Sequence, residues 1–426
     1  MSHCSPAAAP LFGLPTLLAP LVLACLCPDA QAEGSPWYLG VSQRLTYESN
    51  LYRVDTAAAL GNLSRSDTVS STSLVAGLDQ TLGRQRLYGN ATLGANRYSH
   101  NDYLNDTSYS VTGGLDWSSA ERLSGNLSMA ASRNQRSFNV DSGPNLAETR
   151  KNNESVAQVD ATVRAGEVTR LTIEATLGHR RVGYSAPEYT GSQYQQNRGS
   201  LGLRYRPGVA TFGAALSLAD SRYESPLVQE ANGQAGEQVR RSSLDLTVNW
   251  PASGATNVYA RLSPTRATYS EFTQRDFSGL TGALRWNWAA TGKLSLDTRF
   301  VHDISQDSNF ETFGGPAVVG TSNTGRTTTE LRFTVGYDMT AKTALTATLG
   351  TTHRRLEQTA NLASLSVVTG VGSDDTNTLS IGWRWTPQRS LQMSCNLARE
   401  QRSATGRLTQ AYRANTANCY GQFTLQ

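Results

Sequence analysis

The sequence lacks a long apolar run outside residues 1–27. No later stretch approaches the roughly 18–20 apolar residues that a membrane-spanning helix needs, and the mean hydropathy of the 426 residues is −0.40. A bundle of membrane-spanning helices is therefore excluded. Lysine is scarce as well, because it occurs only at Lys151, Lys293 and Lys342, so that arginine carries nearly all of the positive charge.

The excess of arginine over lysine has two interpretations. A GC-rich genome favours arginine codons and would produce the excess without any functional cause. Alternatively, arginine lines a pore that anionic solutes use, since the guanidinium group binds carboxylates and phosphates in a fixed geometry. The net charge of +4 is too small to identify a partner, and no feature of the sequence indicates binding to nucleic acid.

Motifs for catalysis and for metal binding are missing too. The four histidines that follow the N-terminal segment, His100, His179, His302 and His353, are scattered along the chain, whereas a metal site needs ligands that converge. The sequence contains no glycine-rich phosphate loop and no cysteine–histidine zinc spacing. Serine is so abundant that no catalytic nucleophile stands out. We therefore expect a protein that is not an enzyme and that has no cofactor or metal.

The N-terminal segment has the features of an export signal. Residues 11–26 form an apolar core, and Ala30-Gln31-Ala32 matches the small-x-small pattern that precedes a cleavage site. We expect residues 1–32 to be a signal peptide and residues 33–426 to be the mature protein. As an alternative, residues 22–25 resemble the acylation motif of a lipoprotein, in which Cys25 would carry the lipid.

From about Tyr38 to its end, the sequence repeats a simple alternation of apolar and polar residues. Leu244, Leu246, Val248 and Trp250, for example, are separated by single polar residues. Successive side chains of a β-strand point to opposite faces, so each such segment predicts a strand with one apolar and one polar face. A series of roughly ten-residue strands of this kind behind an export signal is typical of a transmembrane β-barrel.

The number of alternating segments predicts an all-β fold, an antiparallel up-and-down barrel of about eighteen strands without a plug domain, with sixteen strands as the alternative. Short turns follow the even-numbered segments and longer connections follow the odd-numbered ones. In bacterial barrels the short turns lie in the periplasm, so we expect both chain ends there. The connections at 135–154, 223–239 and 304–326 are then expected to be extracellular loops.

Tryptophan is concentrated at one end of the predicted strands. A sandwich core would not gather its tryptophans at one end, whereas amphipathic rings prefer the headgroup depth of a membrane. We therefore expect an aromatic girdle at the periplasmic rim, and tyrosines near the opposite rim as its counterpart. The girdle residues are Trp37, Trp117, Trp250, Trp286, Trp288, Trp383 and Trp385, and the tyrosines are Tyr98, Tyr103, Tyr109, Tyr223 and Tyr269.

Two cysteines lie outside the signal segment, Cys395 and Cys419, and they fall on the last two predicted strands. If the connecting loop is centred near residue 407, these cysteines are directly opposite each other. Opposed Cβ atoms in an antiparallel pair are about 4.5–5.5 Å apart, which is close to the distance that a disulfide requires. We predict a disulfide, and two free thiols that face the lipid are the alternative.

The polar face of the predicted strands carries more arginine than acid. An eighteen-stranded barrel encloses a water-filled lumen unless loops fold into it, so these arginines are candidates to line a pore. The alternative is that they pair with carboxylates on neighbouring strands, as Arg299 and Glu330 could. The candidate pore-lining residues are Arg164, Arg204, Arg261, Arg285, Arg299, Arg332 and Arg384.

Three short motifs resemble one family of proteins. The sequences YESNLYR at 47–53, GRQRL at 83–87 and QFTLQ at 422–426 are similar to those of EpsL-type proteins. That family consists of outer-membrane β-barrels from exopolysaccharide operons, often beside an exosortase system, and is related to the β-barrel porin type 2 group. The resemblance implies an outer-membrane component for the export of a secreted polysaccharide.

Three functions are compatible with these expectations. The first is a pore or conduit for exopolysaccharide, the second is a closed barrel whose loops bind or anchor polysaccharide at the cell surface, and the third is a general diffusion porin. The expected partners are outer-membrane lipid and lipopolysaccharide, the secreted polysaccharide and periplasmic export components. Nucleic acid is not an expected partner.

Overall fold

The computed structural model describes residues 35–119, 122–138, 149–166, 169–224, 236–270, 273, 276–312, 319–362, 365–406 and 408–425. The expected signal peptide, residues 1–32, and its alternative acylation site at Cys25 lie outside the described residues. The described residues from Pro36 onward belong to one compact unit. Within the described ranges, no helix is long and apolar enough to cross a membrane.

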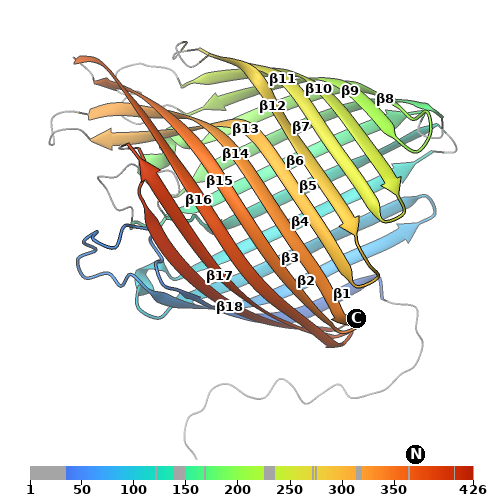
Figure 1. The fold of residues 1–426 in the computed structure, drawn as a ribbon, viewed down its shortest axis with the longest axis horizontal. Coiled ribbons are helices and arrows are strands. Elements are labelled where there is room, and N and C mark those ends of the chain that lie inside the picture. The colour runs from blue at the N-terminus through green and yellow to red at the C-terminus, as the bar shows by residue number, and fades with distance from the viewer. Residues whose placement is uncertain are drawn as a thin grey trace, which may run out of the picture. The chain divides into compact units, whose positions relative to one another are not determined.

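Eighteen antiparallel strands form one closed sheet (Figure 1). Each strand pairs with its neighbours in the sequence, and β1 also pairs with β18, which closes the barrel. The predicted fold and the count of eighteen are confirmed, and the alternative of sixteen is wrong. The first nine strands are β1 (Trp37–Glu48), β2 (Asp67–Leu82), β3 (Gln85–Tyr98), β4 (Asp106–Ser118), β5 (Leu123–Gln135), β6 (Asn153–Ala165), β7 (Leu171–Tyr184), β8 (Tyr194–Tyr205) and β9 (Thr211–Tyr223). The other nine are β10 (Gln238–Ser253), β11 (Thr256–Tyr269), β12 (Phe277–Ala289), β13 (Leu294–Thr312), β14 (Val319–Thr340), β15 (Thr343–Leu362), β16 (Leu365–Gln388), β17 (Leu391–Thr405) and β18 (Tyr412–Leu425).

The alternation in the sequence determines which face of the sheet each side chain occupies. Large apolar residues such as Leu216 and Leu397 are 66% and 63% exposed, because they point outward, where lipid would cover them. Their neighbours in the sequence point into the lumen. This inverted distribution, apolar outside and polar inside, is the arrangement of outer-membrane barrels.

Short turns join the strands at one end of the barrel. Between β2 and β3 the turn consists of Gly83 and Arg84, and Gly83 has φ 62°, in the left-handed region that favours glycine. The longer connections lie at the other end and include two short 3-10 turns, η1 (Asp102–Leu104) and η2 (Pro187–Ser192). The first strand begins, and the last strand finishes, at the end where the short turns lie (Figure 1).

The expected extracellular loop at 304–326 is wrong for most of its length. β13 continues to Thr312, β14 begins at Val319, and the two strands pair throughout these extensions. The sequence here has Ser, Thr and Asn at both odd and even positions, so that the alternation of apolar and polar residues disappears. Backbone hydrogen bonds do not depend on that alternation, and the hairpin therefore continues beyond it. The expected loops at 135–154 and 223–239 fall partly outside the described residues.

The barrel wall is incomplete between β12 and β13. Their pairing ends where Gly282 lies opposite His302, although β12 begins five residues earlier, at Phe277, and β13 continues to Thr312. β13 also lies against η2, in the connection between β7 and β8. An ion pair from Arg241 of β10 to Asp303, at 2.9 Å, fixes the position where β13 leaves the wall. The two strands consequently separate in their loop-side halves (Figure 1).

Candidate functional site

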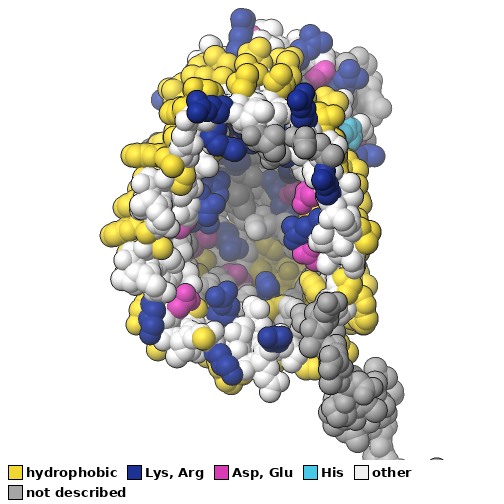
Figure 2. All heavy atoms as spheres, turned by 90° about the vertical axis from the view of Figure 1, so that its right-hand side faces the viewer, with side chains coloured by type: hydrophobic (Ala, Val, Ile, Leu, Met, Phe, Trp, Pro, Cys, Tyr) yellow, Lys and Arg dark blue, Asp and Glu magenta, His cyan; other side chains and the backbone are white. Residues whose placement is uncertain are grey.

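The lumen is the candidate functional site, and charged side chains line it. Figure 2 views the barrel from the end where the short turns lie, and Lys and Arg side chains surround the central hollow with fewer Asp and Glu among them. The strand register places every candidate pore-lining arginine on the inner face, between outward-facing residues such as Phe300 and Leu331. These arginines are Arg164, Arg204, Arg261, Arg285, Arg299, Arg332 and Arg384.

Carboxylates pair with many of these arginines. Near the short turns, Glu174 of β7 binds Arg164 of β6 at 2.6 Å and Arg204 of β8 at 2.7 Å. Each carboxylate oxygen of Glu174 therefore accepts a hydrogen bond from an arginine of a different strand, and the three side chains join β6, β7 and β8. Halfway along the barrel, Arg261 lies 3.8 Å from Asp245. These pairs reduce the positive charge that the sequence alone suggested.

A row of three arginines crosses neighbouring strands on the inner face. Arg285 of β12 is directly opposite Arg299 of β13, and Arg299 is directly opposite Arg332 of β14. Side chains opposite each other in a sheet have Cβ atoms about 4.5–5.5 Å apart, and like charges at that distance repel. We call these three residues the arginine row. All three are exposed to the lumen.

Two carboxylates partly neutralise the arginine row. Asp297 lies 2.8 Å from Arg285, and Glu330 lies 2.9 Å from Arg332. Among the described residues no carboxylate pairs with the central Arg299, and none pairs with Arg384 near the short turns. The expectation that Arg299 could pair with Glu330 is wrong, because Glu330 is opposite Val301, two residues farther along β13. The sequence pattern gave the correct face for both residues but not their register.

A buried ion cluster that the sequence pattern does not predict lies on the inner face, nearer the long connections. Asp374 of β16 is 1% exposed and binds Arg354 of β15 through two hydrogen bonds, of 2.7 and 2.8 Å. Arg402 of β17 lies 4.0 Å from the same carboxylate and over the ring of Tyr412. Local sequence gives no signal for this cluster, because its residues come from four strands.

The connection between β1 and β2 folds against inward-facing residues near the long connections. Tyr52 is fully buried, packs edge-on against Phe138 and hydrogen-bonds with Tyr103 at 2.9 Å. Burial, together with this hydrogen bond, raises the pKa of Tyr52 above its usual range. Arg53 lies 3.8 Å from Glu48 and 3.6 Å from Glu400, both on the inner face. Residues of the YESNLYR motif therefore hold this connection inside the rim.

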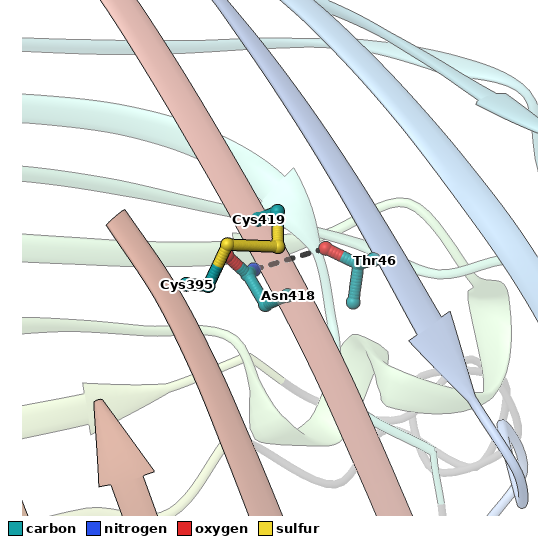
Figure 3. Close-up of a disulfide and its surroundings, with 4 residues drawn as sticks. All are labelled: Thr46, Cys395, Asn418 and Cys419. Carbon is teal, nitrogen blue, oxygen red and sulfur yellow. Dashed lines mark hydrogen bonds between the residues drawn. A yellow bond between two sulfur atoms is a disulfide. The ribbon is translucent and has the colours of Figure 1, made fainter. Parts of the chain in front are cut away.

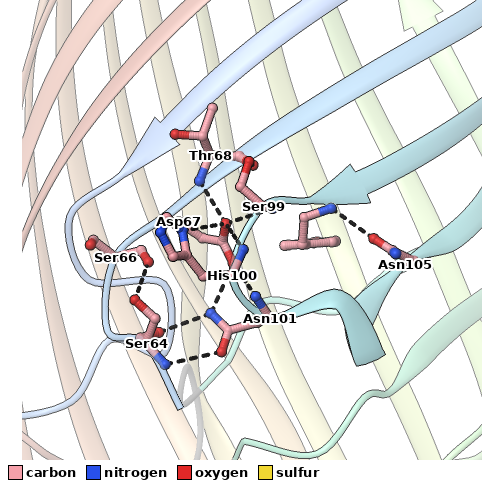
Figure 4. A network of polar contacts seen from close by, with 9 residues as sticks. Ser64, Ser66, Asp67, Thr68, Ser99, His100, Asn101 and Asn105 are labelled. Atoms are coloured by element: carbon pink, nitrogen blue, oxygen red, sulfur yellow. Dashed lines mark hydrogen bonds and ion pairs between the residues drawn. The ribbon is translucent and has the colours of Figure 1, made fainter. Parts of the chain in front are cut away.

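Hydrogen bonds to the carboxylate of Asp67 attach the connection between β1 and β2 to the barrel (Figure 4). This carboxylate accepts hydrogen bonds from the backbone N–H groups of Thr68, Ser99 and Asn101 at 2.7, 2.9 and 2.8 Å, and from the side chain of Asn101 at 2.8 Å. Asn101 in turn bonds to the backbone of Ser64 in both directions. One buried carboxylate thus joins β2, the residues after β3 and the connection after β1.

The tryptophans lie where the sequence analysis placed them, on the outward face near the short turns, and the girdle itself stays a prediction. Trp286 stacks with Trp288 at 5.8 Å between ring centroids, and Trp383 stacks with Trp385 at 6.2 Å. The expected tyrosine counterpart is wrong for most of its members. Tyr109 faces outward, whereas Tyr98, Tyr223 and Tyr269 are on the inner face of their strands and Tyr103 binds Tyr52.

The four histidines of the described residues lie apart from one another: His179, His302 and His353 are on β7, β13 and β15, and His100 follows β3. His179 hydrogen-bonds with Asn197, His302 with Thr329 and His353 with Asp375, while His100 lies 3.6 Å from Asp67. In the part of the chain that the structure describes, no group of three or more potential metal ligands comes together.

A disulfide joins Cys395 of β17 to Cys419 of β18 (Figure 3). The two residues are directly opposite in the register, their Cα atoms are 4.1 Å apart, and both are on the outward face. The neighbouring Asn418 points to the inner face and bonds to Thr46 of β1 at 3.0 Å. The bridge thus ties the last hairpin together beside the seam where β18 meets β1.

Replacing both Cys395 and Cys419 with alanine is expected to lower the free energy of unfolding by about 3 kcal/mol, because the bridge closes a loop of 24 residues in sequence separation. Chemical unfolding of the purified protein in detergent measures the difference, with chemically reduced wild type as the matched control. Mass spectrometry of unreduced, unfolded wild type after alkylation provides the second measurement. Alkylation of either cysteine in that sample would contradict the bridge.

Comparison with known proteins informs only on the architecture of the chain and not on its function. No family model and no curated protein matches the chain. The outer membrane protein opdK from Pseudomonas aeruginosa is 10% identical, with a TM-score of 0.46 over 91% of this chain and 99% of that one. OccK5 (OpdH) from the same organism is 12% identical, with a TM-score of 0.41 over 92% and 98%. The ferric enterobactin receptor PfeA, as a double mutant, is 7% identical, with a TM-score of 0.45 over 92% and 81%.

Proposed function

We propose that the protein is a water-filled outer-membrane pore through which an anionic polysaccharide is exported. The main observation that supports this proposal is the arginine row. Three exposed arginines and two carboxylates leave a local charge of +1 on the lumen wall, with Arg299 at the centre unpaired by any carboxylate of the described residues. An anion in the lumen would relieve the repulsion within the row.

The chemistry of arginine favours a carboxylate-bearing sugar as the cargo. A guanidinium group donates two parallel hydrogen bonds to a carboxylate, so a uronate residue would bind to the row side-on. Arg384 adds another arginine on the inner face closer to the short turns, and Arg261 lies beside the row at mid-height. Several weak sites in series let a chain enter and leave without being trapped. The family resemblance of the three motifs supports the same direction of transport.

Deletion of the gene tests the proposal. We expect the deletion strain to synthesise the polysaccharide but to lose it from the cell surface, and a plasmid copy of the wild-type gene is expected to restore secretion. The measurement is the uronate content of the surface fraction and of the cell interior. Normal secretion by the deletion strain would rule out a role in export, whatever the conductance of the purified protein.

A closed barrel that anchors polysaccharide is the second candidate. The observation in its favour is the attachment of the connections after β1, β3 and β5 to one another, through Tyr52, Phe138 and Tyr103 and through Asp67. Such contacts could also serve to keep the mouth of the barrel shut. Steady conductance of the purified protein in planar bilayers would exclude the closed barrel, and conductance without any effect of the deletion on secretion would favour a general diffusion porin.

A further inference from the structure

An apolar hollow lies on the lipid-facing surface where β12 and β13 begin to separate. Its volume is about 700 Å³, within the roughly 300–1,000 Å³ that is typical of small-molecule sites. Gly282 of β12 lines the hollow and contributes no side chain to it. The large side chains around it face outward from β10, β11, β12 and β13, and they are Leu246, Leu262, Leu280, Leu284 and Phe300.

Three exposed arginines lie on the same outward face, nearer the long connections. They are Arg222 of β9, Arg240 of β10 and Arg266 of β11, which we call the rim arginines. One carboxylate, Asp220 of β9, is opposite Arg240, but it accepts a hydrogen bond from the side chain of Gln238 at 2.9 Å. No ion pair joins a rim arginine to a carboxylate of the described residues, so the patch has a net positive charge.

The hollow and the rim arginines lie one above the other on the same strands. Arg266 is four residues beyond Leu262 on β11, and Arg240 is six residues beyond Leu246 on β10, in both cases on the same face. At about 3.4 Å per residue, Arg266 is roughly 14 Å along the strand from the hollow. On β12, Leu280 and Leu284 precede Trp286 and Trp288 of the opposite rim, so the hollow lies in the apolar band and the arginines lie at its outer edge.

This arrangement has the chemistry of a lipid rather than of a soluble ligand. An apolar cavity at hydrocarbon depth accepts an acyl chain, and exposed arginines at the interface attract an anionic headgroup. We propose that a phosphorylated lipid of the outer leaflet binds here, with one acyl chain in the hollow at Gly282 and its phosphate on Arg240 and Arg266. The site is independent of the cargo of the lumen.

Native mass spectrometry of the full-length mature protein in detergent, titrated with diphosphoryl lipid A, tests the proposal. We expect the Arg240→Gln/Arg266→Gln variant to bind lipid A at least about tenfold more weakly than wild type. Ala260→Phe places a ring in the hollow from β11 and is expected to weaken binding severalfold. Arg133→Gln removes an exposed, outward-facing arginine of β5, a strand that contributes no residue to the hollow, and it is expected to leave binding unchanged.

The outcomes separate the two halves of the site. Equal affinity of wild type and Arg240→Gln/Arg266→Gln would overturn the phosphate site, and so would equal binding of a lipid A without phosphates. Equal affinity of wild type and Ala260→Phe would overturn the acyl-chain site, as would full competition by inorganic phosphate alone. The shift of each variant between its folded and heat-unfolded bands on gel electrophoresis shows that the barrel has formed before binding is compared.

Discussion

Replacing Asp374 with alanine is expected to lower the free energy of unfolding by about 3–5 kcal/mol. Asp374 is 1% exposed, and the arginines around it, Arg354 and Arg402, are 5% and 6% exposed. Removal of the carboxylate leaves two buried guanidinium groups close together without their shared counter-ion. Removal of one partner from a buried ion pair costs far more than an exposed ion pair contributes.

Urea-induced unfolding of the folded protein in detergent, followed by tryptophan fluorescence, measures this effect. The matched control is Asp375→Ala, because Asp375 is the next residue of β16, points to the opposite face and is half exposed beside His353. Its loss is expected to cost at most about 1 kcal/mol. If both variants unfold at the same urea concentration, the buried cluster does not stabilise the barrel.

The largest expected effect on transport comes from replacing the arginine row, Arg285, Arg299 and Arg332, with glutamine. Because Asp297 and Glu330 remain, the local charge changes from +1 to −2. We expect the ratio of anion to cation permeability to fall by about tenfold, since a change of only 1.4 kcal/mol in the electrostatic energy of an ion produces that factor. The reversal potential in a salt gradient across a planar bilayer measures this ratio.

A triple variant with the same change in net charge is the control. Arg97, Arg133 and Arg181 are exposed arginines on the outward face of β3, β5 and β7. Their replacement with glutamine is expected to leave the permeability ratio nearly unchanged, because the barrel wall separates them from the lumen and salt screens them from it. An unchanged ratio in the variant of the arginine row would show that these residues do not determine selectivity.

The sequence predicted correctly the features that depend on the alternation of apolar and polar residues. The alternation predicted the strands, their number and the inner face of every candidate arginine, and it placed Cys395 opposite Cys419. It did not predict the expected tyrosine girdle, because Tyr98, Tyr223 and Tyr269 lie on the inner face. The sequence did not predict the strands correctly where this alternation is absent. The Ser- and Thr-rich extensions of β13 and β14 were predicted to be a loop, because polar residues at both odd and even positions give no alternation.

What the sequence by itself determined is the closed barrel with its apolar outside and its charged inside, because a local pattern fixes the direction of each side chain. Only the tertiary structure decided which side chains meet. The register places Arg299 between two arginines and not beside Glu330, and Asp374 between arginines of two other strands. The opening between β12 and β13 has the same origin. Contacts of this kind depend on how strands far apart in the sequence align and bend, and a period of two carries no information about that alignment.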